Sequence, residues 1–249
     1  KYILSLLKEK YDIEEDDFNS AELEIVPAGR ARDCGIDRSM VMCYGQDDRA
    51  CAYTSFRAIL SVELPKRTAC CMLVDKEEIG SIGNTGMESR FFENTIAEVL
   101  DRLGMYSELN VRRCLSHSKV ISSDVAVGFD PNYPSISSKD NTAYFGKGLV
   151  MEKYTGSRGK YSATDANAEY LAQIRKCMDD QNIVSQFAEL GKIDAGGGGT
   201  IAYIVANLNM EVIDAGIPVQ NMHAPFEVTS KADVYEAYLG YKAFLEYMN

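Results

Sequence analysis

Histidine and tryptophan are the scarcest residues of this chain: among 249 residues, His117 and His223 are the only imidazoles, and tryptophan is absent. Two histidines exclude any metal site that needs three imidazoles from this chain. Long apolar runs are also missing, since none approaches the roughly 20 residues that span a bilayer, and no signal peptide is visible. We therefore expect no membrane partner and a cytoplasmic protein.

Positive charge is in short supply. Lysine and arginine number 26 against 37 aspartates and glutamates, which leaves a net charge of −11. Binding to nucleic acid or to an anionic membrane requires the opposite balance, so we expect neither partner. The seven cysteines are odd in number and include no Cys-x-x-Cys spacing, which argues against zinc knuckles and a disulfide framework and fits a reducing compartment.

The remaining composition, 46% hydrophobic and 25% charged, is typical of a folded globular protein. After a short amphipathic helix within residues 1–20, strand patterns alternate with helical ones, which predicts an α/β fold. We expect a three-layer sandwich in which helices flank a mostly parallel central sheet. Strands are predicted at 21–26, 39–43, 69–74, 120–127, 148–151, 184–190 and 212–219, and helices at 50–62, 88–103, 164–178, 200–208 and 231–247.

Acidic side chains and one histidine follow four of the predicted strands, namely Asp47, Glu77, Glu78, Asp124 and His223. In α/β folds, ligands bind beyond the carboxyl ends of the strands, so these side chains are expected to gather. Carboxylates with one imidazole suit Zn²⁺, Mn²⁺ or Co²⁺. Two divalent cations would relieve the mutual repulsion of the acids, and two adjacent glutamates can divide metal binding and proton transfer between them.

Five stretches in a fixed order resemble the aspartyl aminopeptidase family, metallopeptidase family eighteen. Residues 75–81, Asp-Lys-Glu-Glu-Ile-Gly-Ser, are similar to the family's Asp-x-Glu-Glu-Val/Ile-Gly-Ser motif. The other four are Gln-Asp-Asp at 46–48, Ser-Asp at 123–124 with Asp-Pro-Asn-Tyr at 130–133, Gly-Gly-Thr-Ile at 198–201 and Asn-Met-His at 221–223. The resemblance extends from about Glu22 to the C-terminus.

The resemblance implies a metal-dependent aminopeptidase with two divalent ions, zinc or alternatively cobalt or manganese. Asp47 would bridge the two ions, Glu77 would be the general base, Glu78 and His223 would complete the shell of the second ion, and Asp124 would bind the first. It also implies peptide substrates with an acidic N-terminal residue and a large closed homo-oligomer, with a dodecamer as one expected size. Residues 1–20 would be the tail of an inserted oligomerisation domain, and residues 21–249 the metallopeptidase catalytic domain.

Substrate contacts are expected at two further places. The glycine run before Thr200 lacks the Lys-Ser/Thr of a phosphate-binding loop, so Gly198, Gly199 and Thr200 are expected to let the backbone approach the substrate. Lys153 opens the most basic local stretch, 153–160, which either binds a substrate carboxylate or is a solvated loop.

Two departures from the family pattern leave alternatives open. The family's first metal also takes a histidine from an upstream His-x-Asp motif, whereas no histidine precedes Asp47 here, and we expect that this chain begins late. Val127 and Asp130 stand where the family commonly has histidines, which leaves the acidic preference open. The alternatives are an incomplete or inactive catalytic-domain fragment with a structural, oligomer-forming role, and an amidohydrolase acting on acylated amino acids.

Overall fold

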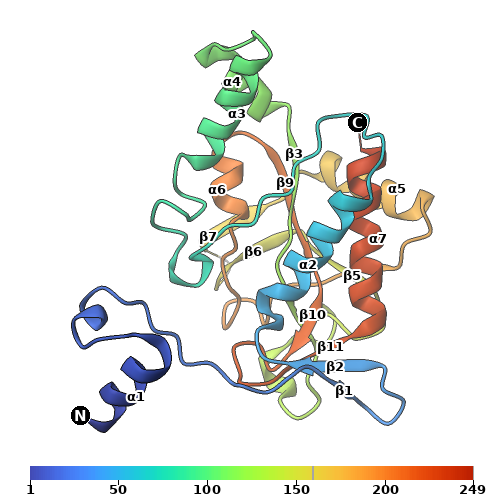
Figure 1. Ribbon diagram of the computed structural model, residues 1–249. Helices are drawn as coiled ribbons and strands as arrows, with labels where there is room; N and C mark the ends of the chain where they lie inside the picture. The colour runs from blue at the N-terminus through green and yellow to red at the C-terminus, as the bar shows by residue number, and fades with distance from the viewer. Residues whose placement is uncertain (159, 249) are drawn as a thin grey trace.

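A four-stranded sheet runs through the centre of the computed structural model (Figure 1), in the order β3-β9-β5-β8. The structure describes residues 1–158 and 160–248, so residue 159 of the basic stretch and residue 249 lie outside the described residues. Strands β3 and β9 are parallel, as are β5 and β8, but β5 is antiparallel to β9. The strands are β3 (Lys119–Ser122), β9 (Glu211–Gly216), β5 (Leu149–Glu152) and β8 (Ser185–Phe187).

A second sheet of five strands has the order β1-β2-β11-β10-β4, and only its β10–β4 pair is parallel. The predicted α/β fold is confirmed, but the sheets are mixed and not clearly mostly parallel, since the four-stranded sheet contains one antiparallel pair and the five-stranded sheet only one parallel pair. Short connections such as the one between β10 and β11 force their strands to be antiparallel, because a parallel crossover needs a dozen or more residues. The strands are β1 (Arg32–Cys34), β2 (Met40–Cys43), β11 (Glu227–Ser230), β10 (Pro218–Gln220) and β4 (Ala126–Val127).

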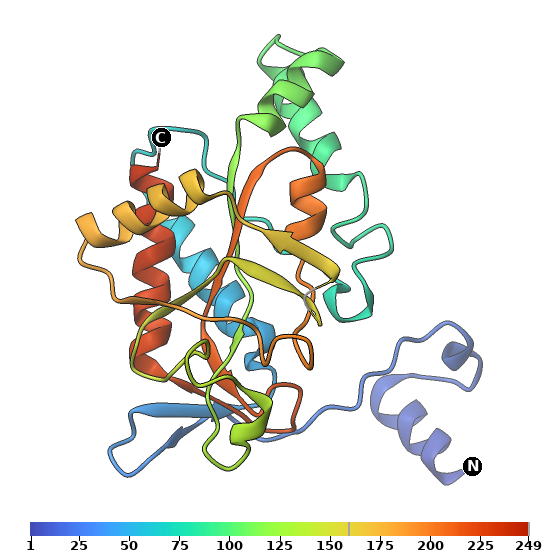
Figure 2. The same cartoon turned by 180° about the vertical axis from the view of Figure 1, so that it is seen from behind.

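Helices cover both faces of the four-stranded sheet, as Figures 1 and 2 show. Neighbouring residues of β9 point to opposite faces: Ile213 packs in the core beneath α2, α5 and α7, and Val212 packs in the core beneath α3, α4 and α6. The helices are α2 (Gln46–Ser61), α5 (Ala168–Asp180), α7 (Lys231–Tyr247), α3 (Phe91–Arg102), α4 (Glu108–Ser116) and α6 (Ala202–Asn207), and a short 3-10 helix, η3, covers Pro134–Ile136.

Helix α7 has the predicted bounds, and its first turn is held by a buried carboxylate. Asp233 accepts backbone N–H groups from Gly146 at 2.8 Å and from Gly148 at 2.7 Å. Its own N–H donates to the hydroxyl of Ser230, which caps the helix. This carboxylate ties the start of α7 to the chain that enters β5.

Two predicted strands are wrong, and several predicted helices begin at other residues, such as α2 at Gln46 instead of residue 50. Residues 69–74 lie outside any strand, and Leu73 is 61% exposed; residues 21–26 also form no strand. A strand needs a ladder partner, and neither segment pairs with another strand among the described residues. Thr164 belongs to β7 (Tyr161–Asp165), which pairs with β6 (Tyr154–Ser157) in a hairpin, so the helix predicted from 164 begins at Ala168.

The N-terminal segment lies apart from the two sheets in both ribbon views (Figures 1 and 2). It contains α1 (Tyr2–Tyr11) and a 3-10 helix, η1 (Asp16–Asn19), and the Tyr2 and Tyr11 side chains are exposed. The assignment of residues 1–20 to an oligomerisation domain stays a prediction.

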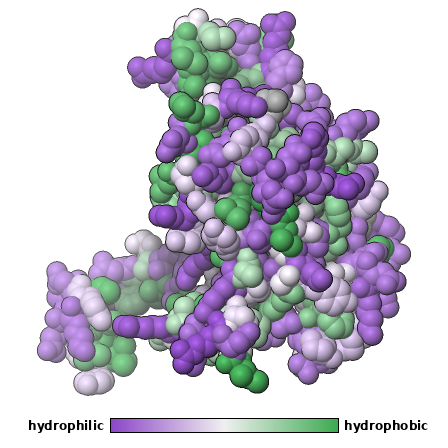
Figure 3. All heavy atoms as spheres, turned by 90° about the vertical axis from the view of Figure 1, so that its right-hand side faces the viewer, coloured by the Kyte–Doolittle hydropathy of each residue, from purple (hydrophilic) through white to green (hydrophobic). Residues whose placement is uncertain are grey.

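The surface over α5 and α7 is mostly hydrophilic, and hydrophobic side chains gather instead at the end formed by α3 and α4 (Figure 3). Exposed residues there include Leu103, Tyr106 and Leu109. Within the described part of the chain, no helix combines the length and the hydrophobicity that crossing a membrane requires.

Candidate metal centre

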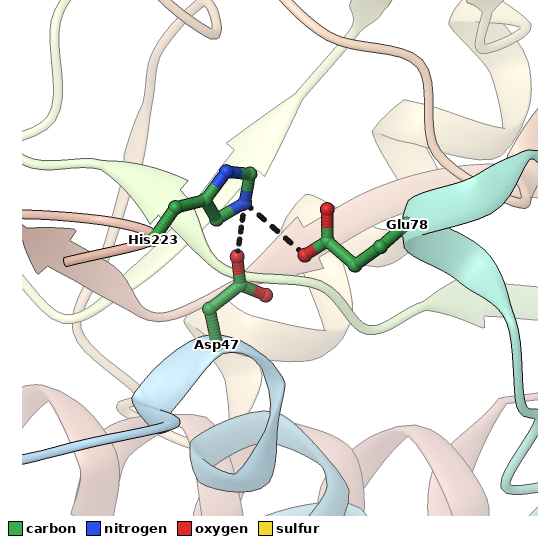
Figure 4. A group of neighbouring side chains, drawn as sticks. All are labelled: Asp47, Glu78 and His223. Carbon is green, nitrogen blue, oxygen red and sulfur yellow. Dashed lines mark ion pairs between the residues drawn. The ribbon is translucent and has the colours of Figure 1, made fainter. Parts of the chain in front are cut away.

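Three side chains from three separate segments converge on one point (Figure 4). Nε2 of His223, in the loop between β10 and β11, lies 2.9 Å from Oδ2 of Asp47 and 3.1 Å from Oε1 of Glu78. Asp47 lies in the first turn of α2, and Glu78 lies in a 3-10 helix, η2 (Glu77–Ile79). We call Asp47, Glu78 and His223 the histidine group; their ligand atoms lie within 4.8 Å of one another.

A second cluster shares one member with the first. Asp47, Asp48 and Asp124 also place one carboxylate oxygen each within 4.8 Å of the others, and we call them the aspartate group. Asp124 follows β3, as the sequence predicts, whereas Asp48 was missed as a candidate although it directly follows Asp47. Among the described residues, the buried Oδ1 of Asp48 has no hydrogen-bond partner.

The residues of both groups fit a divalent metal ion. Burial and the charge of Glu78 raise the pKa of Asp47 to about 6, although His223 opposes the shift. Burial raises the pKa of Asp48 to about 8 and holds the pKa of Asp124 well above its ordinary value, and neighbouring carboxylates add to both shifts. Acids that resist ionisation because of burial and mutual repulsion are stabilised as carboxylates by a cation. Carboxylate oxygens with one imidazole nitrogen also form a donor set typical of zinc.

Glu77 lies beside both clusters without belonging to either. Burial raises the pKa of Glu77 to about 7, the charges of Glu78 and Asp47 add to the shift, and His223 opposes it. A carboxyl group that titrates near neutrality can both accept and donate a proton at working pH. This environment suits the general base that the sequence predicts at Glu77.

The backbone around these residues explains how they are presented. Helix η2 is a single turn between Lys76 and Gly80, both with positive φ, and the N–H of Gly80 donates to the carbonyl of Glu77 at 2.9 Å. Gly216 of β9 packs against the Asp124 backbone so closely that a Cβ there would lie 1.5 Å from the Asp124 carbonyl oxygen. Only glycine allows this approach, which brings the segment of Asp124 against the sheet.

The predicted substrate-binding residues lie beside the β6–β7 hairpin. The carbonyl of Gly198 accepts the N–H of Gly156, and Gly199 packs against Ser162. The hydroxyl of Thr200 donates to Oδ1 of Asp214 at 2.7 Å and accepts the N–H of Ala202, which caps the start of α6.

Lys153 follows β5 and forms an ion pair with Asp165 of β7, and its ammonium lies 4.2 Å from the centre of the Tyr154 ring. A substrate role for Lys153 stays a prediction. His117 ends α4 at an exposed position and belongs to neither group.

Sequence reasoning missed three acids that lie inside strands. Asp214 of β9 faces Glu152 of β5 in register, both are buried, and Asp214 raises the pKa of Glu77 and Asp124 through its charge. Glu227, the first residue of β11, is also buried. For Asp214, a charged residue within the apolar pattern of 212–219 was the available signal, since such residues are rarely buried without a partner.

The chain is similar to known proteins along nearly its whole length. The family model described as aminopeptidase I zinc metalloprotease (M18) matches residues 1–245. A probable M18 family aminopeptidase 1 from Clostridium acetobutylicum is 60% identical over 243 residues, which cover 98% of this chain and 52% of that relative. The crystal structure of an M18 aminopeptidase from Thermotoga maritima is 44% identical, with a TM-score of 0.95, and the match covers 98% of this chain and 54% of that one.

A more distant structure shares the fold alone. The Saccharomyces cerevisiae mApe1 dodecamer is 18% identical to this chain, with a TM-score of 0.74 over 98% of this chain and 54% of that one. The chain spans about half the length of the relatives it matches.

Proposed function

The chain belongs to the M18 family of aminopeptidase I zinc metalloproteases, and from this premise we propose that it carries a two-metal centre that releases N-terminal residues from peptides. The observation that carries the proposal is the position of Asp47, which belongs to both the histidine group and the aspartate group. A carboxylate shared between two ligand clusters is what a bridge between two metal ions requires.

Asp47 would bridge two divalent ions, zinc being the metal that the family description names. Glu78 and His223 would complete the shell of one ion, and Asp124 would bind the other. Bound ions of this kind polarise a scissile carbonyl and lower the pKa of the attacking water. The histidine group is open to substrate, since the His223 side chain is 61% exposed while that of Asp47 is 9% exposed.

Glu77 would act as the general base. Its carboxylate would take a proton from the attacking water and later donate a proton to the leaving amine, and its position beside both ligand groups supports this role. The surrounding acids favour a substrate with a free, positively charged α-amino group, because opposite charges attract.

The backbone of the Gly198–Thr200 segment would approach the substrate, and Lys153 would bind an acidic side chain or a carboxylate of the substrate. We also propose a homo-oligomer, with residues 1–20 contributing contacts between subunits. The dodecamer of the yeast relative supports twelve as the size to test.

Zinc content and turnover test the function together. The chain is loaded with zinc, its metal content is measured, and hydrolysis of a dipeptide with a free amino terminus is compared with that of its N-acetylated form. Two zinc ions per chain with hydrolysis of the free peptide alone is the expected result. Hydrolysis of the acetylated substrate instead would favour an amidohydrolase. One ion or none, without turnover, would favour a non-catalytic fragment.

A further inference from the structure

Glu227 connects two proposed metal ligands through their backbones. Its Oε1 accepts the N–H of His223 at 2.8 Å, and its Oε2 accepts the N–H of Asp47 at 3.1 Å. The residue is only 2% exposed. One buried carboxylate therefore links the loop that carries the histidine to the helix that carries the shared aspartate.

The ladder between β11 and β2 determines where this carboxylate lies. Glu227 pairs in register with Cys43, the last residue of β2, and α2 begins shortly afterwards at Gln46. The carboxylate is thus anchored beside the start of α2. Helix N-termini leave N–H groups without partners within the helix, and the residue at the N-cap of α2 is Gly45, which has no side chain to accept one. Instead, Oε2 of Glu227, in strand β11, accepts the N–H of Asp47 in the first turn of this helix.

The hydrogen bond from the N–H of His223 to Glu227 involves a residue with an unusual backbone conformation. His223 has φ of 63°, in the left-handed region that non-glycine residues rarely adopt. Such conformations persist where the surrounding structure holds them in place. The N–H of His223 is held by Oε1 of Glu227, so the carboxylate stabilises the loop conformation from which the imidazole reaches Asp47.

We propose that Glu227 is a positioning residue of the metal centre, which sets the separation of Asp47 and His223 by accepting one N–H from each. The inference rests on the proposed metal function. Glutamate suits the task because an ionised carboxylate is purely an acceptor at both oxygens, whereas glutamine would present an NH₂ donor to one of the two N–H groups. Loss of one bond would leave one ligand free to shift, although neither ligand is itself altered.

The test compares Glu227→Gln with Asp233→Asn. Asp233 is the matched control, because it is also buried and also accepts two backbone N–H groups, from Gly146 and Gly148, but it lies outside both ligand groups. Zinc affinity is measured by competition with a chelating dye, and Tm is measured without metal. We expect both variants to lower Tm, and only Glu227→Gln to weaken zinc binding, by about 10–100-fold, as is usual for groups that orient metal ligands.

Wild-type zinc affinity in Glu227→Gln would overturn the inference while leaving the proposed function in place. Failure of the unaltered chain to bind zinc would overturn both. A measurement on the metal-free wild type covers the case in which the variant does not fold: the amide protons of Asp47 and His223 should be protected from exchange with solvent. Rapid exchange at both would contradict the proposed bonds.

Discussion

Nε2 of His223 lies 2.9 Å from Oδ2 of Asp47, the distance of a charge-assisted hydrogen bond. Without metal, a proton on the imidazole can occupy this contact. A divalent ion bound by the same two atoms replaces this hydrogen bond. The pKa of Asp47 is raised to about 6 and that of Asp48 to about 8, mainly by burial, so zinc must also displace protons from these acids, because metal ligands bind in their deprotonated forms. Zinc uptake by this chain should therefore release protons, and zinc affinity should fall as the pH is lowered.

Replacing His223 should remove the only imidazole of the two ligand groups. We expect His223→Ala to weaken zinc binding at the histidine group by more than about 100-fold, beyond the 10–100-fold typical of outer-shell changes. His117→Ala is the matched control, because His117 is exposed and lies outside both groups. Dye competition measures both variants, and an equal loss of affinity in the two would contradict the assignment.

Glu77→Gln should separate proton transfer from metal binding. Because Glu77 belongs to neither ligand group, the variant should keep its zinc, but kcat should fall by about 10²–10⁴-fold, the usual contribution of a general base. Glu108→Gln, at an exposed position in the first turn of α4, is the control. Steady-state hydrolysis measures the effect, and undiminished turnover would remove Glu77 from this role.

Stability of the metal-free chain should fall as pH rises from about 4 to about 8. In the folded chain the pKa values of Asp47, Glu77 and Asp48 are raised to about 6, 7 and 8, while the unfolded chain releases these protons near the ordinary values of 3.8 to 4.5. The folded state then binds more protons over this range, so ionisation favours unfolding. Urea titrations at pH 5 and pH 8 measure the trend, and zinc should reverse it. A rise in stability with pH in the metal-free chain would contradict this account.

Glu152→Gln should stabilise the chain at high pH. Glu152 is 5% exposed, its Oε1 has no hydrogen-bond partner among the described residues, and burial beside Asp214 raises its pKa well above the ordinary value. Neutral glutamine avoids the cost of ionising this buried group, so the free energy of unfolding at pH 8 should rise by about 1–3 kcal/mol. At pH 5 the effect should be small. Glu98→Gln, on the exposed surface of α3, should change little at either pH.

The candidate site was largely predictable from the sequence, because it is built from residue types with distinctive chemistry at strand ends. Asp47, Glu78 and His223 were expected together and are together. Glu227 was not predictable in the same way, since it acts through backbone N–H groups of Asp47 and His223, and hydrogen bonds to the backbone leave no signature in the identity of the donor residue.

The fold was predictable where the pattern is local. The helix at 231–247 was predicted with its observed bounds, because its periodicity and cap lie within the segment itself. Strand pairing depends on distant segments, which explains why 69–74 fails as a strand and why β5 runs antiparallel to β9. The strand predicted at 212–219 is interrupted at Ile217, where the chain passes from one sheet to the other as β9 and β10.

The number of zinc ions bound by Asp47→Asn tests most directly whether Asp47 joins two metal sites. Native mass spectrometry of zinc-loaded chains gives the count for wild type, His223→Ala and Asp47→Asn. We predict two ions for the wild type, one for His223→Ala and neither ion tightly bound in Asp47→Asn, because asparagine cannot supply a bridging carboxylate. Two tightly bound ions in Asp47→Asn would contradict the account.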